Sequence, residues 1–297
     1  MAWVGVFLIG VMSGAALGLA TGVPVAESYA ATPVAENRLR SSASTIMGRP
    51  ADAIIPVVPD GLMPQRPRIA IVIDDLGLSW AGFRAVNTLP APVTLSFLPY
   101  GDDAQAMMNE LSEGHDAMLH LPMEPQVRVQ DAGPNMLVLG QSEEVLRKAL
   151  LENLTSLSGY SGVNNHTGSK FTADRDAMAV VLKELDQRGL FFLDSITTGR
   201  PVAHRLAAQH DYAVIERNVF LDHDYENISV ESVKAQLAEL ERIAVADGYA
   251  IGIGHPYKVT TEVLSEWMRT AELRGFEIVL VRELTKPEAP RALAQLR

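Results

Sequence analysis

The chain has 297 residues, of which 47% are hydrophobic and 21% charged, and it contains no cysteine. A chain of this length can bury a large core, whereas disulfides, thiol catalysis and cysteine-ligated zinc are excluded. The formal net charge of −11 disfavours contact with a phosphate backbone, so we expect no nucleic-acid partner.

Residues 1–26 carry no charged side chain and are almost wholly apolar. Small residues at positions 28 and 30, Ser28 and Ala30, predict a signal peptide, but the apolar run is also long enough for an anchor in the inner membrane. Glycines recur every four residues, which is typical of a closely packing membrane helix and equally of small residues in a leader: Gly10, Gly14, Gly18 and Gly22. Both interpretations predict a periplasmic protein, either exported or anchored.

Residues 27–67 are rich in Ala, Pro and Ser and predict an extended linker. From residue 68 to residue 286, short apolar runs alternate with longer amphipathic stretches, which predicts one domain of repeated β-α units. The tail, 287–297, contains Pro287 and Pro290 and is expected to be loose.

Within the domain, continuously apolar runs predict strands that are covered on both faces. These runs are 69–73, 93–97, 117–121, 162–164, 190–193, either 212–215 or 219–221, 250–253 and 277–281. Helical patterns lie at 102–113, 142–157, 174–188, 229–246 and 260–274. This alternation predicts an α/β fold with a parallel barrel, closed or incompletely closed. No GxGxxG or GxxxxGK[ST] motif follows a strand, so nucleotide binding has no support.

Polar residues gather where the predicted strands end, which is where parallel α/β folds place their chemistry. They are Asp74, Asp75, His120, Asn164, Asn165, His166, Asp194, Asp222, His223 and His255. Each alone is explained as a helix cap, a turn or a hydrogen-bonded core residue. Their shared placement favours a functional site.

The adjacent acids Asp74 and Asp75 leave their strand in different directions, so one can bind a metal while the other takes a proton. An Asp and two neutral His side chains form a suitable three-ligand zinc site with one position open. The remaining histidines, His115, His204 and His210, are expected at the surface.

At this point the sequence resembles the divergent polysaccharide deacetylases, a branch of the metal-dependent carbohydrate deacetylases. The resemblance runs from about residue 69 to residue 284 and is carried by six motifs. They are IDDLG at 73–77, HLPMEP at 120–125, NNHTGS at 164–169, FLDS at 192–195, VFLD at 219–222 and GHP at 254–256. The resemblance implies a distorted (β/α) barrel of about seven strands, deacetylase-like, and a role in carbohydrate metabolism of the cell envelope.

The resemblance also implies roles for individual residues. It makes Asp74 the general base, Asp75 and His120 metal ligands, and His255 the general acid. Glu124 stands where the wider group has its second metal-binding His, so either Glu124 or His166 completes the site. The preferred ligands are Asp75, His120 and His166, with Glu124 as a substitute ligand or a residue that orients one.

Three further residues are candidates for a ligand or for a side chain that orients a ligand: Asn165, Asp194 and Asp222. The expected cofactor is a divalent metal, zinc by preference, and the expected reaction is hydrolysis of acetyl groups from an amino-sugar polymer, peptidoglycan included. The alternative is a non-catalytic glycan-binding or envelope-assembly protein on the same barrel. Oligomeric state and leader cleavage stay open.

Overall fold

The computed structural model describes residues 65–127, 133–224 and 226–285. The predicted leader (1–26), most of the linker (27–67) and the tail (287–297) lie outside these residues. Among the described helices, none has the length and apolar character needed to cross a membrane.

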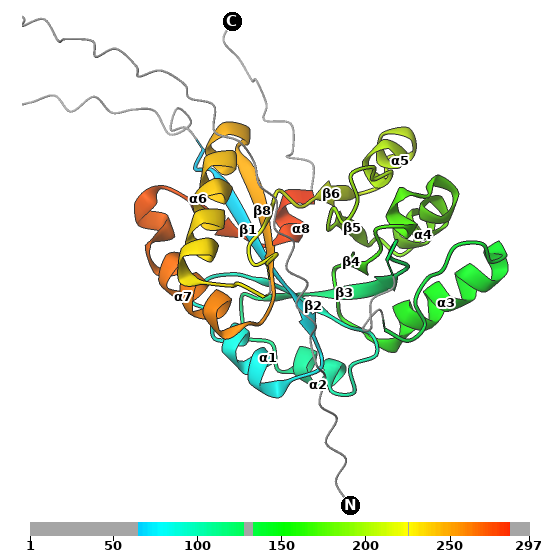
Figure 1. The fold of residues 1–297 in the computed structure, drawn as a ribbon, viewed down its shortest axis with the longest axis horizontal. Coiled ribbons are helices and arrows are strands. Elements are labelled where there is room, and N and C mark those ends of the chain that lie inside the picture. The colour runs from blue at the N-terminus through cyan, green and yellow to red at the C-terminus, as the bar shows by residue number, and fades with distance from the viewer. Residues whose placement is uncertain (1–64, 128–132, 225, 286–297) are drawn as a thin grey trace, which may run out of the picture. The chain divides into compact units, whose positions relative to one another are not determined.

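Nine strands in the described residues form one parallel sheet (Figure 1). They are β1 (Arg68–Leu76), β2 (Thr94–Phe97), β3 (Asp116–Met123), β4 (Gly162–Thr167), β5 (Phe191–Asp194), β6 (Val214–Glu216), β7 (Val219–Phe220), β8 (Tyr249–Gly254) and β9 (Glu277–Val279). Eight follow the order β6-β5-β4-β3-β2-β1-β8-β7, and β9 pairs with the start of β1. The sheet curves into a half-barrel, which confirms the predicted α/β barrel with two strands more than expected.

The two alternative strand segments, 212–215 and 219–221, both contribute a strand, and these strands lie at opposite ends of the sheet order. Only Arg217 and Asn218 connect them. Their backbone N–H groups donate to Asp194 O and Ile251 O respectively, so each edge receives one further hydrogen bond. The two ends of the half-barrel are therefore joined by a short stretch of chain and not by pairing between β6 and β7.

Most helices in the described residues cover the outer face of the sheet (Figure 1). The helices are α1 (Trp80–Asn87), α2 (Ala104–Asn109), α3 (Glu143–Ser156), α4 (Arg175–Gln187), α5 (Ala203–His210), α6 (Val230–Asp247), α7 (Lys258–Ala271) and α8 (Val281–Thr285), with short 3-10 turns at Phe171–Ala173 and Glu272–Arg274. The last helix instead packs Val281 and Leu284 against strand residues of the inner face. The sequence pattern missed α1 and α5, which have only eight residues each, and it assigned the start of α8 to the last strand. Ser142, Asp174 and Ser229 cap three of the four long helices, α3, α4 and α6, and Ser229 forms a capping box with Ser232.

Side chains alternate between two hydrophobic clusters along each strand. In β1, Ile69, Ile71 and Ile73 pack in the larger cluster with the helices. Ala70 and Val72 belong to a smaller cluster built almost wholly from strand residues, which fills the barrel interior. The next inward position after Val72 is Asp74. The inner face therefore changes from apolar to polar at the carboxyl ends of the strands.

Candidate active site

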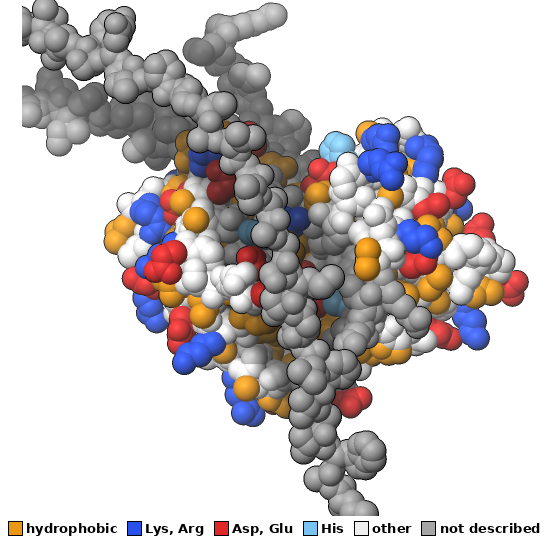
Figure 2. Space-filling model, in the orientation of Figure 1, with side chains coloured by type: hydrophobic (Ala, Val, Ile, Leu, Met, Phe, Trp, Pro, Cys, Tyr) orange, Lys and Arg blue, Asp and Glu red, His pale blue; other side chains and the backbone are white. Residues whose placement is uncertain are grey.

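Polar side chains from neighbouring strands meet above the inner hydrophobic cluster. His120 follows Met118 at the inward positions of β3, and Ser195 follows Leu193 at the end of β5. In the space-filling view, carboxylate and His side chains show in the middle of the molecule, between the positions of α6 and α4 (Figure 2). The period of two therefore brings the residues of several predicted strand ends to one place.

The two adjacent acids converge on this place because the backbone turns between them. Asp74 is 3% exposed and points inward. Asp75 would face outward in a regular strand, but its φ of 60° is left-handed and the β1–β2 register is interrupted here. A non-glycine residue in this conformation costs about 1–2 kcal/mol. This backbone conformation turns the Asp75 carboxylate toward the site. Nε2 of His120 lies 3.3 Å from Oδ1 of Asp75 and 3.7 Å from Oδ2 of Asp74.

Asp75, His120 and His166 present three ligand atoms to one another. His166 Nδ1 lies 3.1 Å from Asp75 Oδ1 and 3.2 Å from His120 Nε2, and the third side of the triangle is the 3.3 Å separation given above. In tetrahedral zinc with bonds of about 2.0–2.1 Å, two ligand atoms lie roughly 3.3–3.4 Å apart. The triangle therefore matches one face of a zinc tetrahedron.

The hydrogen bonding of this triangle also fits a cation. Oδ1 of Asp75 is buried and makes no hydrogen bond. When the two imidazoles are neutral, ring-nitrogen lone pairs and a carboxylate oxygen can be satisfied together by one shared metal ion. The donor set of two nitrogens and one oxygen suits zinc and several other divalent ions.

The protein environment shifts the pKa values of Asp74 and Asp75 in opposite directions. Burial raises the pKa of Asp74, and this effect outweighs the attraction of His120 and His255. Burial acts in the same direction on Asp75, but its contacts with His120 and His166 hold the pKa of this carboxyl well below its usual range. Asp74 is thus the better proton acceptor, and Asp75 is an anion suited to a metal.

His255 approaches the second carboxylate oxygen of Asp75, with its Nε2 3.6 Å from Asp75 Oδ2. Asp222 holds the ring: its Oδ1 is 2.9 Å from His255 Nδ1, while its Oδ2 accepts from the His255 backbone N–H and from Thr260 Oγ1, both at 2.8 Å. Burial would lower the pKa of His255, but Asp222 and Asp75 raise it above its usual value. An imidazole held in this way can donate a proton from Nε2.

Three of the sequence candidates do not face this site. Asn165 Nδ2 donates to the backbone oxygen of Thr167, and its Oδ1 accepts from the Ser195 N–H. Asp194 is fully buried and accepts from the Ile196 N–H. Both side chains leave their strands on the face opposite to Asn164 and Ser195, as the period of two requires.

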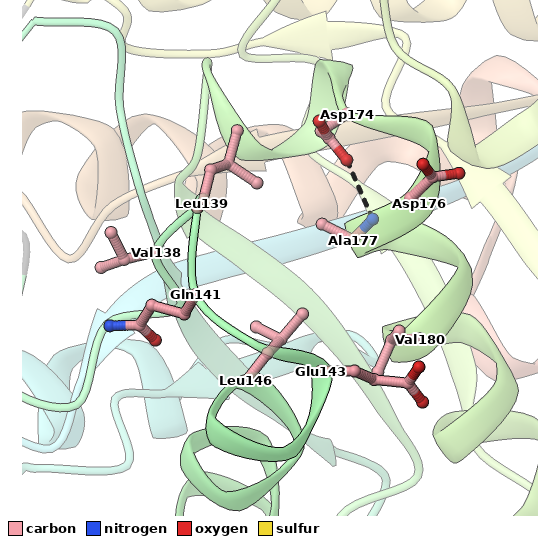
Figure 3. A pocket seen from close by; sticks show the side chains of 10 residues that line it. Val138, Leu139, Gln141, Glu143, Leu146, Asp174, Asp176, Ala177 and Val180 are labelled. Atoms are coloured by element: carbon pink, nitrogen blue, oxygen red, sulfur yellow. Dashed lines mark hydrogen bonds between the residues drawn. The ribbon is translucent and has the colours of Figure 1, made fainter.

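Glu124 is the third sequence candidate that does not face the site. It follows β3 but turns away from the triangle formed by Asp75, His120 and His166. Its carboxylate accepts from Lys170 Nζ at 2.5 Å and from the Leu139 N–H at 2.8 Å. Leu139 lines a pocket of about 350 Å³ at the start of α3 and α4, where Asp174 caps α4 by accepting from the Ala177 N–H (Figure 3). Glu124 therefore anchors the loop beside this pocket.

Sequence reasoning assigned no role to several residues that the structure places at the site. They are Ser96, Asn164, Ser195, Arg217 and Thr260. Asn164 was among the strand-end residues, and alternation along β4 would have distinguished it from Asn165, because Asn164 shares a face with His166. Arg217, which donates to the Ser195 and Ile196 carbonyls and stacks 5.0 Å from the Phe220 ring centroid, carried no such signal.

This chain is similar to a protein family, to a relative of known sequence and to two solved structures. A family model described as divergent polysaccharide deacetylase matches residues 71–285. An uncharacterized protein of Haemophilus influenzae is 33% identical over 205 residues, covering 68% of this chain and 71% of that protein. An uncharacterized protein of Agrobacterium tumefaciens, for which a crystal structure exists, is 32% identical in sequence and has a TM-score of 0.70. The match covers 74% of this chain and 90% of that protein. The catalytic domain of a peptidoglycan N-acetylglucosamine deacetylase of Eubacterium rectale shares the fold, with a TM-score of 0.50 and 15% sequence identity. The match covers 78% of this chain and 96% of that domain.

Proposed function

We propose that this chain, which belongs to the divergent polysaccharide deacetylase family, removes acetyl groups from an amino-sugar polymer of the cell envelope by metal-dependent hydrolysis. The observation that carries the proposal is the triangle of Asp75 Oδ1, His120 Nε2 and His166 Nδ1, with sides of 3.1–3.3 Å. The general base and the general acid candidates lie beside it.

Asp75, His120 and His166 would hold a divalent metal, which would supply Lewis acidity to polarise the acetyl carbonyl and to acidify water. Asp74 accepts the proton of the attacking water, a task favoured by its raised pKa. His255 delivers a proton from Nε2 to the leaving amine, while Asp222 holds Nδ1 and keeps the ring in the required orientation.

The location of the protein is part of the proposal. The apolar, uncharged run at residues 1–26 supports export to the periplasm or anchoring in the inner membrane. Peptidoglycan-type glycans are present there and carry N-acetyl groups, as does the substrate named for the Eubacterium rectale relative.

The test combines metal analysis with measurement of acetate released from peptidoglycan and from N-acetylglucosamine oligomers. Wild type should hold about one zinc per chain and release acetate. Asp75→Ala should lose both properties, whereas Asp74→Asn should keep zinc and lose roughly 10²–10⁴-fold in turnover. Asp186→Asn, on the exposed side of α4, serves as a control that should change neither.

Two results would count against this function. Undiminished acetate release by Asp75→Ala would remove the metal from the mechanism. A wild-type protein that takes up no zinc even after loading would favour the second candidate, a non-catalytic glycan-binding or envelope-assembly protein. Glu124 supports this alternative, because it stands where the wider deacetylase group has its second metal-binding His.

A further inference from the structure

The side-chain amide of Asn164 touches both halves of the proposed active site. Asn164 is fully buried on the inner face of β4. Its Nδ2 donates to Oδ1 and Oδ2 of Asp74, at 2.9 and 3.1 Å. Its Oδ1 lies 2.8 Å from Nδ1 of His120. One planar group therefore connects the general base with a metal ligand.

Two serines complete the hydrogen bonding of this amide. Ser96 Oγ donates to Asn164 Oδ1 at 2.6 Å, and Ser195 Oγ lies 3.3 Å from Nδ2. Ser195 Oγ itself donates to the backbone oxygen of Asn165, so it accepts from the amide. An Asn side chain offers two donor hydrogens and two acceptor lone pairs, and here all four have partners.

This arrangement determines which end of the amide faces which neighbour. Ser195 Oγ, whose hydrogen goes to the Asn165 carbonyl, can only accept from the amide, so the amino group must lie on the side of Ser195 and Asp74 and the carbonyl oxygen must face His120. Because that oxygen also only accepts, Nδ1 of His120 must carry a hydrogen. The lone pair of the neutral His120 ring is then on Nε2, the atom directed at Asp75 and His166.

We propose that Asn164 is a positioning residue that selects the Nδ1–H tautomer of His120, so that Nε2 is free to bind the metal, and that orients Asp74 through the same amide. The inference rests on the proposed metal site. Residues that orient a metal ligand typically contribute 10–100-fold to metal affinity. Replacement of the amide should therefore weaken zinc binding without removal of any ligand.

The experiment uses Asn164→Leu, which has similar volume but no hydrogen-bonding atoms, in the full chain. ¹⁵N NMR of the histidine rings in the metal-free protein reports the tautomer at a pH above the pKa of His120, which Asp74 and Asp75 raise against the effect of burial. Chelator competition reports the zinc dissociation constant. We expect the His120 Nδ1–H form in wild type, loss of that preference in the variant and a 10–100-fold increase in the dissociation constant. Asn165→Leu is the matched control, since it removes the neighbouring buried amide on the opposite face.

Asn164→Ser, which leaves room for water, replaces the Leu variant if the latter does not fold. Unchanged His120 ring signals in Asn164→Leu, or equal losses of zinc affinity in the two Leu variants, would overturn the inference. Failure of the proposed function gives a different pattern. Wild type would then release no acetate, while the tautomer and the dissociation constant could still respond to Asn164.

Discussion

Nδ1 of His255 lies 2.9 Å from Oδ1 of Asp222, so an imidazole that follows β8 and a carboxylate that follows β7 form one hydrogen-bonded pair. Parallel pairing of these strands brings the two residues together although they are 33 positions apart. The carboxylate leaves Nε2 of His255 as the ring atom that faces Asp75.

The first prediction concerns this pair. A His that acts as a general acid works in its protonated form, so activity falls as pH rises through its pKa. Asp222 raises the pKa of His255 against the effect of burial. Asp222→Asn should therefore move the alkaline limb of the kcat profile to lower pH and reduce kcat more than it changes KM. Asp224→Asn, at an exposed position nearby, is the control. An unmoved alkaline limb would show that His255 is not the acid.

The second prediction separates the two alternatives for the third ligand. His166→Ala should weaken zinc binding by more than the 10–100-fold that is typical of residues that merely orient a ligand. Glu124→Gln should leave the dissociation constant within a few-fold of wild type, because Glu124 contacts Lys170 and Leu139 instead of the triangle. Chelator competition measures both. The reverse order of effects would make Glu124 the ligand.

The third prediction concerns the buried acid behind β5. Burial raises the pKa of Asp194 to about 6 from 3.8, and its Oδ2 has no hydrogen-bond partner. Because the folded state holds this proton more tightly, Asp194 destabilises the fold above pH 6, and this effect is relieved as pH falls from about 6 toward 3.8. The shift corresponds to at most about 3 kcal/mol.

Asp194→Asn removes the charge and keeps an acceptor for the Ile196 N–H. We therefore expect the variant to unfold at higher urea concentration than wild type at pH 8, with a smaller difference at pH 4.5. Urea titrations at the two pH values measure this, with the exposed Asp186→Asn as control. A variant less stable than wild type at pH 8 would show that the Asp194 carboxylate stabilises the fold.

The fourth prediction concerns the barrel interior beneath the site. A Cβ at Gly162 would lie 2.4 Å from Cζ of Phe191 on the neighbouring strand. Gly162→Ala should therefore destabilise the protein by about 1–3 kcal/mol through overpacking. The double variant Gly162→Ala/Phe191→Leu should recover part of this loss, because the smaller side chain clears the contact. Thermal unfolding of the single and double variants tests it; additive losses would exclude the contact as the cause.

Local patterns in the sequence predicted much of this protein. Continuous apolar runs marked nearly every strand, since strands covered on both faces need apolar residues at every position. The placement of Asp74, His120, His166 and His255 was visible for the same reason, because these polar residues interrupt or follow the apolar runs. The motifs in this order also indicated the family.

Tertiary structure alone decided how these residues meet. The left-handed backbone at Asp75, the loop that carries Glu124 away and the choice of Asn164 over Asn165 depend on strand register and on loop conformation. Asn164 and Asp74 are 90 positions apart, and no local pattern states that their side chains will be 2.9 Å apart. Sequence periodicity determines which face a side chain occupies, but the contacts across that face are set by the order and curvature of the whole sheet.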